Sequence, residues 1–248
     1  MISDGVVLKN VSFSFDSRTK ILKNINLRID KGSFVGVAGG NGSGKTTFTK
    51  LLNGLIPQET EGELTGGVFI DGDSTRDFQI SHFAKKVGMV FQNPDFSLFN
   101  LTVAEEVEFV LKNLNIKNSG EKIAESLKLV GMEKLLRADP QSLSFGQKQK
   151  VALASVLVQQ PRVLVLDEPT AMLDYKSGLN LFSILKKLNK KGTTVVTVEH
   201  DTDLLEQYAS RIIILDKGKV AADGSPKAVF SDKNLMNEAG VKIPDKFL

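Results

Sequence analysis

The sequence predicts an α/β fold in which a mainly parallel sheet is preceded by an N-terminal antiparallel β-subdomain and interrupted by an inserted α-helical subdomain. Three observations lead to this prediction. Four short, largely apolar runs are typical of parallel strands that are covered on both faces. Apolar and polar residues alternate in two segments near the N-terminus, which is the pattern of half-buried strands. Residues 92–162 carry helix-capping patterns but no strand pattern.

The composition narrows the class of protein. The chain has 248 residues, 41% apolar and 25% charged, which suits one large α/β domain or a core with an inserted subdomain. The absence of cysteine excludes disulfides, thiol catalysis and Cys-ligated metals, and two histidines are too few for a zinc cluster. A formal net charge of +3 and short lysine pairs indicate solvated faces and no nucleic-acid partner. Neither a signal-peptide core nor a membrane-spanning run is apparent.

The N-terminal part is predicted to form two paired strands, a buried strand and a helix. Alternation over Asn10–Phe15 and Asn24–Ile29 predicts two strands, and the polar turn between them predicts antiparallel pairing. The continuous run Phe34–Ala38 predicts a strand covered on both faces. After a glycine-rich loop, Lys45–Asn53 places its apolar residues on one helical stripe, and Gly54 follows where a helix commonly ends.

Three further apolar runs predict the other parallel strands: Val87–Phe91, Val163–Leu166 and Thr194–Val198. Each run ends in polar residues, and ligands gather at the carboxyl ends of parallel strands. Arg211–Val220 predicts a closing hairpin around Asp216–Gly218.

The region without strand signals is predicted to hold three amphipathic helices, each bounded by a cap or a glycine. They are Val103–Leu114 behind a Thr102/Glu105 capping box, Ile123–Val130 ending at Gly131, and a helix capped by Ser144 and Gln147 that runs to about Gln159. We therefore expect a single domain over residues 1–248, composed of an α/β core with the β-subdomain (1–95 and 160–230), a helical subdomain (96–159) and a short polar tail (231–248).

A phosphate-binding pattern lies between the third predicted strand and the first predicted helix. Gly39–Thr46 (GGNGSGKT) matches G-x-x-x-x-G-K-[ST]. Glycines allow backbone conformations that other residues avoid, so successive N–H groups can converge on phosphate oxygens at the positive end of a helix. Lys45 can reach the β- and γ-phosphates, and the Thr46 hydroxyl can ligate Mg²⁺. A tight turn would explain the glycines alone.

Two acidic residues end the apolar run Val163–Glu168 (VLVLDE). Such residues are costly to bury unless a metal or a reacting water uses them. We expect Asp167 to hold the hydration shell of Mg²⁺. We expect Glu168 to point to the other face of the strand and to polarise the attacking water. Capping of the following turn is the alternative.

Two more polar residues end predicted strands and are candidates for the same site. Gln92 could reach the metal or the water, although a surface glutamine would look the same. His200 could contact the γ-phosphate and position the water, or it could be a structural histidine. His82 has no comparable setting, and we assign it no role.

The set resembles the nucleotide-binding subunit of ABC transporters across nearly the whole chain. Leu143–Gln147 (LSFGQ) is similar to the family signature LSGGQ and lies shortly before VLVLDE. The other motifs occur in the family's order: the phosphate loop, the Q-loop at Gln92, the D-loop at Ala171–Asp174 (AMLD) and the switch histidine at His200. The resemblance implies a P-loop NTPase core of the RecA-like type, ATP and Mg²⁺ as ligands, and hydrolysis of ATP to ADP and phosphate.

The resemblance also implies which residues form the site. ATP held by this chain would contact Phe15, Gly39, Gly40, Asn41, Gly42, Ser43, Gly44, Lys45, Thr46 and Thr47. Phe15 would stack on the base, with Phe13 as the other candidate, although periodicity alone leaves a core role open. Mg²⁺ would be held by Thr46, Gln92 and Asp167, and hydrolysis would involve Glu168, His200 and Gln92. ATP held by the opposite subunit would contact Ser144, Phe145, Gly146 and Gln147 of the signature. Asp174 of the D-loop would also belong to the ATP-binding residues.

A finer resemblance is to the ATPases of energy-coupling factor (ECF) transporters. Phe91–Phe109 (FQNPDFSLFNLTVAEEVEF) is similar to the stretch after the Q-loop in that group. The resemblance implies two ATPases at the cytoplasmic face of the membrane, docked on a shared transmembrane coupling subunit, with a separate membrane protein that captures a vitamin or a transition-metal ion. An ABC transporter for another cargo, or a soluble ABC ATPase without a transport role, is the alternative.

Two positions depart from the family pattern. Phe145 replaces the usual third-position glycine of the signature, and Ala171 replaces the common serine of the D-loop. A bulky side chain at position 145 could hinder the approach of the γ-phosphate held by the partner. We therefore expect a dimer with a related but different ATPase and two unequal ATP sites.

Overall fold

The central sheet has six strands in the order β10-β9-β3-β8-β7-β6, in a computed structural model that describes residues 5–16, 19–117 and 119–248. All neighbours in this sheet run parallel except β9 and β10. The strands are β3 (Phe34–Ala38), β6 (Val87–Val90), β7 (Val163–Asp167), β8 (Thr194–Val198), β9 (Arg211–Asp216) and β10 (Lys219–Gly224). The predicted parallel core and its closing hairpin are confirmed.

The parallel strands are buried on both faces because successive residues enter different cores. Every residue of β3, β7 and β8 is buried. In β3, Phe34 and Ala38 belong to the core shared with the helical subdomain, α7 and α8, whereas Val35 and Val37 belong to the core shared with α1 and the second sheet. Sheet layers of this kind leave only the strand ends open to ligands.

The second sheet is antiparallel, with the order β2-β1-β4-β5. Its strands are β1 (Gly5–Ser14), β2 (Lys20–Asp30), β4 (Glu63–Ile70) and β5 (Asp73–Ser74). The predicted β1–β2 pair is confirmed, with longer strands than expected. The sequence did not reveal β4, since Gly66 and Gly67 interrupt its alternation. Gly66 has φ +77°, and a Cβ there would lie 2.3 Å from the Asn10 carbonyl oxygen, so the close approach of β1 and β4 requires glycine.

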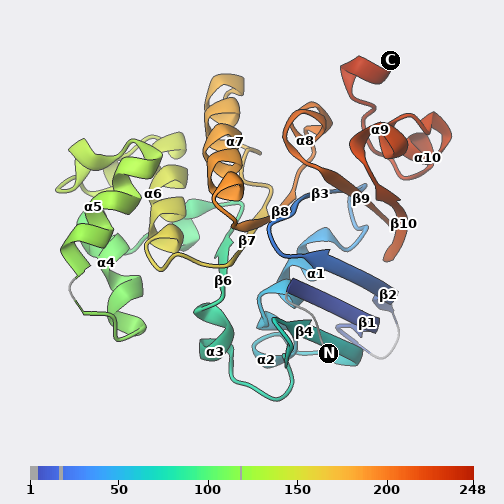
Figure 1. The fold of residues 1–248 in the computed structure, drawn as a ribbon, viewed down its shortest axis with the longest axis horizontal. Coiled ribbons are helices and arrows are strands. Elements are labelled where there is room, and N and C mark those ends of the chain that lie inside the picture. Colours follow the sequence, from blue (N-terminus) through green and yellow to red (C-terminus); the bar gives the residue numbers. More distant parts are fainter. Residues whose placement is uncertain (1–4, 17–18, 118) are drawn as a thin grey trace.

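The helical subdomain lies at one end of the molecule, in green and yellow in Figure 1. It contains α4 (Val103–Asn113), α5 (Ser119–Val130) and α6 (Phe145–Leu157), with short 3₁₀ turns at Pro94–Phe96, Glu133–Leu135 and Pro140–Ser142. Ser144 and Gln147 form the predicted capping box at α6. At α4 the prediction was only half right. Thr102 accepts a hydrogen bond from the backbone of Glu105, but the Glu105 carboxylate accepts from the Thr102 hydroxyl and not from the cap backbone.

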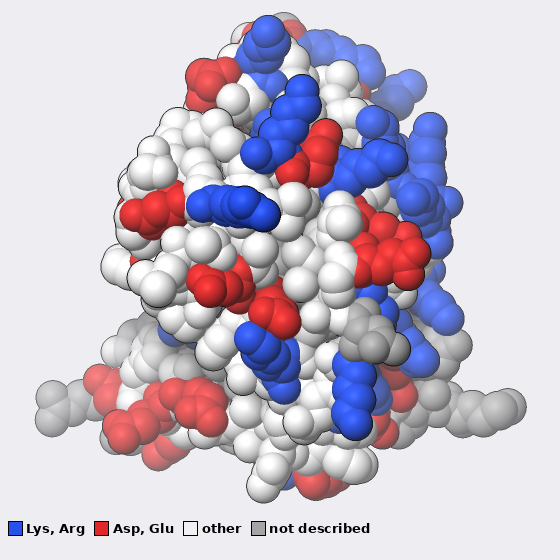
Figure 2. Space-filling model, turned by 90° about the vertical axis from the view of Figure 1, so that its left-hand side faces the viewer, with Lys and Arg blue, Asp and Glu red and all other residues white. Residues whose placement is uncertain are grey.

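The remaining helices lie outside the helical subdomain. They are α1 (Lys45–Leu52), α2 (Leu55–Gln58), α3 (Ile80–Ala84), α7 (Tyr175–Lys190), α8 (Thr202–Tyr208), α9 (Pro226–Phe230) and α10 (Lys233–Glu238), followed by a 3₁₀ turn at Asp245–Phe247. Lys, Arg, Asp and Glu are interspersed on the face seen from the helical end, with Lys and Arg gathered along one side (Figure 2). Among the described residues, no helix has both the length and the apolar character that a membrane crossing needs.

The C-terminal residues form more than the expected polar tail. Met236, Ala239 and Val241 are buried in the core that also contains Leu204, Leu205 and Phe230. Alternating polar residues hide this contribution in the sequence, because only three apolar side chains in α10 and the turn after it face inward.

Candidate nucleotide site

The phosphate loop occupies the carboxyl end of β3, where the topology opens the sheet to a ligand. Gly42 and Gly44 have φ values of +75° and +102°, which only glycine adopts readily. Helix α1 begins at Lys45 with no side-chain cap on its first N–H groups, so these donors remain available to a ligand. A cavity of about 300 Å³ is lined by this loop and by Glu168. The site therefore offers backbone donors and a positive helix end to an anion.

Lys45 is the buried cation of this cavity, with 6% of its surface exposed. Its Nζ donates hydrogen bonds to the carbonyl oxygens of Gly39 at 2.9 Å and Gly40 at 3.1 Å, and lies 4.0 Å from Glu168 Oε1. Burial lowers the pKa of the Lys45 ammonium, while the nearby carboxylates of Glu168 and Asp167 oppose that shift. The ammonium thus rests on backbone oxygens that phosphate oxygens can replace.

Asp167 ends β7 beneath the phosphate loop, and its exposed fraction is 6%. Burial raises the pKa of its carboxyl, and hydrogen bonding from Thr46 opposes the increase. Its Oδ1 is buried without a hydrogen-bond partner. A buried, unpartnered carboxylate oxygen beside a hydroxyl is the hard donor set that Mg²⁺ accepts, so Thr46 and Asp167 fit the predicted metal. When bound there, Mg²⁺ would neutralise charge on the phosphates. The predicted contact of Gln92 with Mg²⁺ remains a prediction.

Glu168 is held at the mouth of the cavity by two of the predicted partners. Its Oε1 lies 2.9 Å from His200 Nε2, and its Oε2 accepts a hydrogen bond of 3.1 Å from Gln92 Nε2. The expectation that strand alternation aims this side chain was wrong: β7 ends at Asp167, and Glu168 adopts φ +50°. A non-glycine residue in this region is strained, and such residues occur at functional sites. The turn of the backbone therefore brings the carboxylate to His200 and Gln92.

Phe15 and Phe13 differ sharply in their surroundings. Phe13 is buried in the β1 core, whereas Phe15 lies just beyond β1 and is 52% exposed. The two rings meet edge to face at 5.0 Å. Phe15 is thus free to stack on a base while Phe13 supports it, and base stacking by Phe15 remains a prediction.

The signature and D-loop residues lie outside the lining of the Lys45 cavity. Ser144 is exposed at the start of α6, and Phe145, Gly146 and Gln147 are partly exposed. Asp174 caps α7: its carboxylate accepts hydrogen bonds from the backbone N–H of Ser177 at 2.9 Å and from its hydroxyl at 2.8 Å, and these bonds lower its pKa. An ATP contact by Asp174 would be additional to this structural role.

The order of these motifs along the chain agrees with a match to a known family. The family described as "ABC transporter" matches residues 22–171. The chain belongs to the ABC transporter family.

Individual relatives are similar to this ABC protein along nearly its whole length. PH1815 of Pyrococcus horikoshii, named as an ABC transporter ATP-binding protein, is 45% identical over 97% of this chain and 86% of its own. The energy-coupling factor transporter ATP-binding protein EcfA of Methanocaldococcus jannaschii is 41% identical over 96% of this chain and 85% of its own. The structure of cbiO1 from Clostridium perfringens, part of the ABC transporter complex cbiONQ, covers 95% of this chain and 94% of its own with a TM-score of 0.83 and 31% identity. The predicted resemblance and fold class are confirmed.

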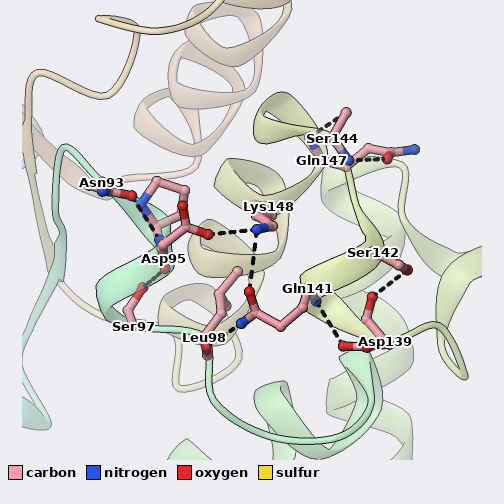
Figure 3. A network of polar contacts seen from close by, with 11 residues as sticks. Asn93, Asp95, Ser97, Leu98, Asp139, Gln141, Ser142, Ser144, Gln147 and Lys148 are labelled. Carbon is pink, nitrogen blue, oxygen red and sulfur yellow. Dashed lines mark hydrogen bonds and ion pairs between the residues drawn. The ribbon is translucent and has the colours of Figure 1, made fainter.

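A polar network links the Q-loop of this ABC protein to its signature helix (Figure 3). Lys148 Nζ, on α6, lies 2.6 Å from Asp95 Oδ1 and 3.4 Å from Gln141 Oε1. Gln141 Nε2 donates a 2.8 Å hydrogen bond to the Leu98 carbonyl oxygen. We call these four residues the polar clasp. No local sequence pattern predicts the clasp, because Asp95 and Lys148 are 53 residues apart and neither stands out among its neighbours.

Glu199 is another residue of this region that no local sequence pattern indicates. It is buried between Val198 and His200, its Oε2 accepts a 2.9 Å hydrogen bond from the Thr170 hydroxyl, and its Oε1 accepts a 3.2 Å bond from the Thr170 N–H. It thereby joins the turn after Glu168 to the turn that carries His200. Burial raises the pKa of Glu199 to about 8, with the Thr170 hydrogen bonds acting in the opposite direction. The carboxyl is therefore mostly protonated at neutral pH.

Glu199 should make the protein less stable as the pH rises from about 5 to 8. In this range the unfolded carboxyl, with an ordinary pKa of 4.5, has lost its proton while the folded carboxyl keeps it until about pH 8. Unfolding then releases a proton, and the free energy of unfolding falls by up to about 1.4 kcal/mol per pH unit. Urea denaturation of the wild type and Glu199→Gln across this range measures the effect. The gap between the two free energies should change with pH, and a constant gap would contradict the assignment.

Proposed function

We propose that this chain is the ATP-hydrolysing subunit of an ECF-type importer that takes up a vitamin or a transition-metal ion. The observation that carries the proposal is the convergence of Gln92 and His200 on Glu168, within 4.0 Å of the buried Lys45. This arrangement suits attack of water on a γ-phosphate. The ECF assignment is supported by the EcfA relative and by the likeness to cbiO1, which is part of cbiONQ.

The reaction follows from the positions of these side chains. Lys45 leaves the carbonyl oxygens of Gly39 and Gly40 and binds the β- and γ-phosphates, where its charge offsets the charge that develops in phosphoryl transfer. Glu168 accepts a hydrogen bond from the attacking water and polarises it. Gln92 and His200 hold that carboxylate and orient the water. The products are ADP and phosphate.

A second protomer is needed to complete this site. The signature residues do not line the cavity of their own chain, although Ser144 caps a helix whose first N–H groups suit a phosphate. In the proposed dimer each signature helix meets the ATP on the opposite subunit, and closure excludes bulk water while the attacking water stays at Glu168. Phe145 at the start of α6 makes the two sites unequal, so we propose a related but different ATPase as the partner.

The surface that docks on the membrane subunit is proposed to be the exposed apolar loop between the Q-loop and α4. Phe96 and Leu101 are 85% and 82% exposed, and Phe99 lies between them. Buried Glu106 fixes this loop, because its Oε2 accepts hydrogen bonds from the backbone N–H groups of Phe99 and Asn100, both 2.9 Å. Isolated exposed apolar residues are common, but three on one fixed loop are typical of an interaction site.

A groove beside this loop extends the docking surface. It has a volume of about 350 Å³ and lies between α4 and the α/β core, where Phe91, Phe109 and Val110 are among its lining residues. Such a groove fits an apolar helix that lies across it. In the proposed assembly the helix belongs to the transmembrane coupling subunit, and a separate membrane protein captures the cargo at the other side of that subunit. The chain would then lie at the cytoplasmic face of the membrane.

Purification of the tagged chain from detergent-solubilised membranes tests the proposed assembly. The wild type should retain a different ATPase and a transmembrane subunit. The double variant Phe96→Ser/Leu101→Ser should keep the ATPase but lose the transmembrane subunit, since both side chains are exposed and their loss leaves the fold intact. Leu129→Ser, at an exposed apolar residue of α5, is the matched control and should retain both partners.

Each part of the proposal fails on a different result, which mass spectrometry of the purified complex would reveal. If this chain is the sole ATPase in the purified complex, the proposed pairing with a different ATPase is contradicted. Retention of the membrane subunit by the double variant would rule out this docking surface. A wild-type complex without any membrane subunit would overturn the importer assignment.

A further inference from the structure

The C-terminal residues reach back to the start of the phosphate loop. The Ala239 carbonyl oxygen accepts a 3.0 Å hydrogen bond from the Gly40 N–H. A Cβ at Gly40 would lie 2.9 Å from the same oxygen, and one at Gly240 would lie 3.9 Å from the Gly40 Cα. Two glycines thus allow the two backbones to touch. We call residues 233–248 the C-terminal strap.

The hydrogen bond to Ala239 is made by the same peptide group that accepts a hydrogen bond from Lys45. In the peptide between Gly39 and Gly40, the N–H donates to Ala239, and the carbonyl oxygen accepts from Lys45 Nζ at 2.9 Å. Hydrogen bonds on both sides of one peptide polarise each other and fix its plane. The strap therefore fixes the peptide at the root of the phosphate loop, and this bond remains when Lys45 leaves the Gly39 carbonyl oxygen for the phosphates.

The strap is also fastened to α8, which begins two residues after His200. Asp203 on α8 accepts hydrogen bonds from Lys242 Nζ at 2.6 Å and from the Asp245 N–H at 2.7 Å. Glu206 on the same helix lies 2.5 Å from Lys246 Nζ. Buried Met236 and Ala239 hold the remaining part of the strap against the core. One segment thereby joins the phosphate loop to the helix that follows the switch histidine.

We propose that the C-terminal strap is a positioning element of the ATP site, which holds the root of the phosphate loop in its ligand-ready shape. Without the strap, the Gly39–Gly40 peptide loses its anchor, and ATP binding has to order the loop. Preorganisation of this kind raises affinity because the ordering cost is met before the ligand arrives. The inference rests on the proposed function only in that the cavity binds ATP.

Nucleotide affinity tests the strap in two variants and one control. Lys242→Ala/Lys246→Ala removes both lysine contacts to α8 and leaves the bond from the Asp245 N–H to Asp203. Gly40→Ala forces the loop and strap apart. Each should weaken binding of a fluorescent ATP analogue by about twofold to tenfold, the worth of a lost hydrogen bond. Lys227→Ala, on α9 before the strap, should bind like the wild type, because Lys227 forms no ion pair within the described part of the chain. Thermal unfolding shows that each variant is folded at the temperature of measurement.

Hydrogen exchange supplies a readout that a purely structural strap would not change. If the strap alters ATP affinity, ATP binding must alter the stability of the strap by the same factor. Exchange of the Val241 N–H, which is bonded to the Met236 carbonyl oxygen at 2.9 Å, should slow when a non-hydrolysable ATP analogue is added to the wild type, while exchange in α5 should not. Unchanged affinity in both variants, or unchanged exchange at Val241, would overturn the inference. Failure of the wild type to bind the analogue would instead overturn the proposed function.

Discussion

Replacing Glu168 with glutamine should leave ATP binding intact and slow hydrolysis by about 10²–10⁴-fold, the usual contribution of a positioned general base. Glutamine keeps the size of the side chain and one carbonyl oxygen, so the bond from Gln92 can persist. It cannot take up a proton from water. The variant should therefore stop after ATP has closed the dimer and accumulate the closed, ATP-bound form with its partner subunit.

Two measurements together define this result. Single-turnover hydrolysis in the purified complex gives the rate, and size-exclusion chromatography with and without ATP gives the dimer population. Glu125→Gln removes an acidic side chain from α5 far from the cavity and is the matched control for charge. A variant that hydrolyses ATP within tenfold of the wild type would show that another group activates the water.

Removing Lys45 should weaken nucleotide binding itself, by about 10–100-fold, as expected for charge-assisted hydrogen bonds to phosphate. In Lys45→Ala the cavity loses its buried cation and keeps Asp167 and Glu168, which repel the phosphates. The same loss should raise the pKa of Asp167 further, since Lys45 is one of the groups that lower it. We expect the variant to lose affinity for ATP whether or not the rate of the chemical step also changes.

Equilibrium binding of a fluorescent ATP analogue to Lys45→Ala measures this effect directly. Lys50→Ala, on the same helix and outside the cavity lining, is the control and should bind like the wild type. An unchanged dissociation constant in Lys45→Ala, with only a lower turnover, would mean that Lys45 contacts the phosphates solely in the transition state.

The parts of the site that could be predicted from sequence are those whose chemistry is local. The glycines, the lysine and the threonine of the phosphate loop lie in one short stretch of sequence. A polar residue follows the apolar run of each of the other predicted parallel strands. The aim of Glu168 could not be predicted, because it depends on a left-handed residue where the strand was expected to continue. The polar clasp, Glu199 and the C-terminal strap were missed for another reason. Each of them is formed by hydrogen bonds between segments that are distant in sequence, and a local sequence pattern does not predict such contacts.

The fold was predictable to a similar extent and for similar reasons. Buried strands and capped helices follow from periodicity, whereas β4 is hidden by the glycines that its close contact with β1 requires. The glycines that allow β4 to pair closely with β1 are thus the residues that interrupt its strand pattern in the sequence. Burial of Met236 in the strap was not predictable for a different reason, since one inward-facing apolar residue on a short helix produces no periodic pattern.

The polar clasp has a mechanical consequence. At one end of the segment 92–98, Gln92 is hydrogen-bonded to the carboxylate of Glu168. At the other end, Asp95 is bonded to Lys148 on α6, and Leu98 to Gln141 just before that helix. A displacement of Gln92 would therefore pull on the bonds at Lys148 and Gln141 and, through them, on the start of α6. In the proposed dimer, a tilt of α6 would carry the occupancy of one nucleotide site to the signature residues at the opposite site.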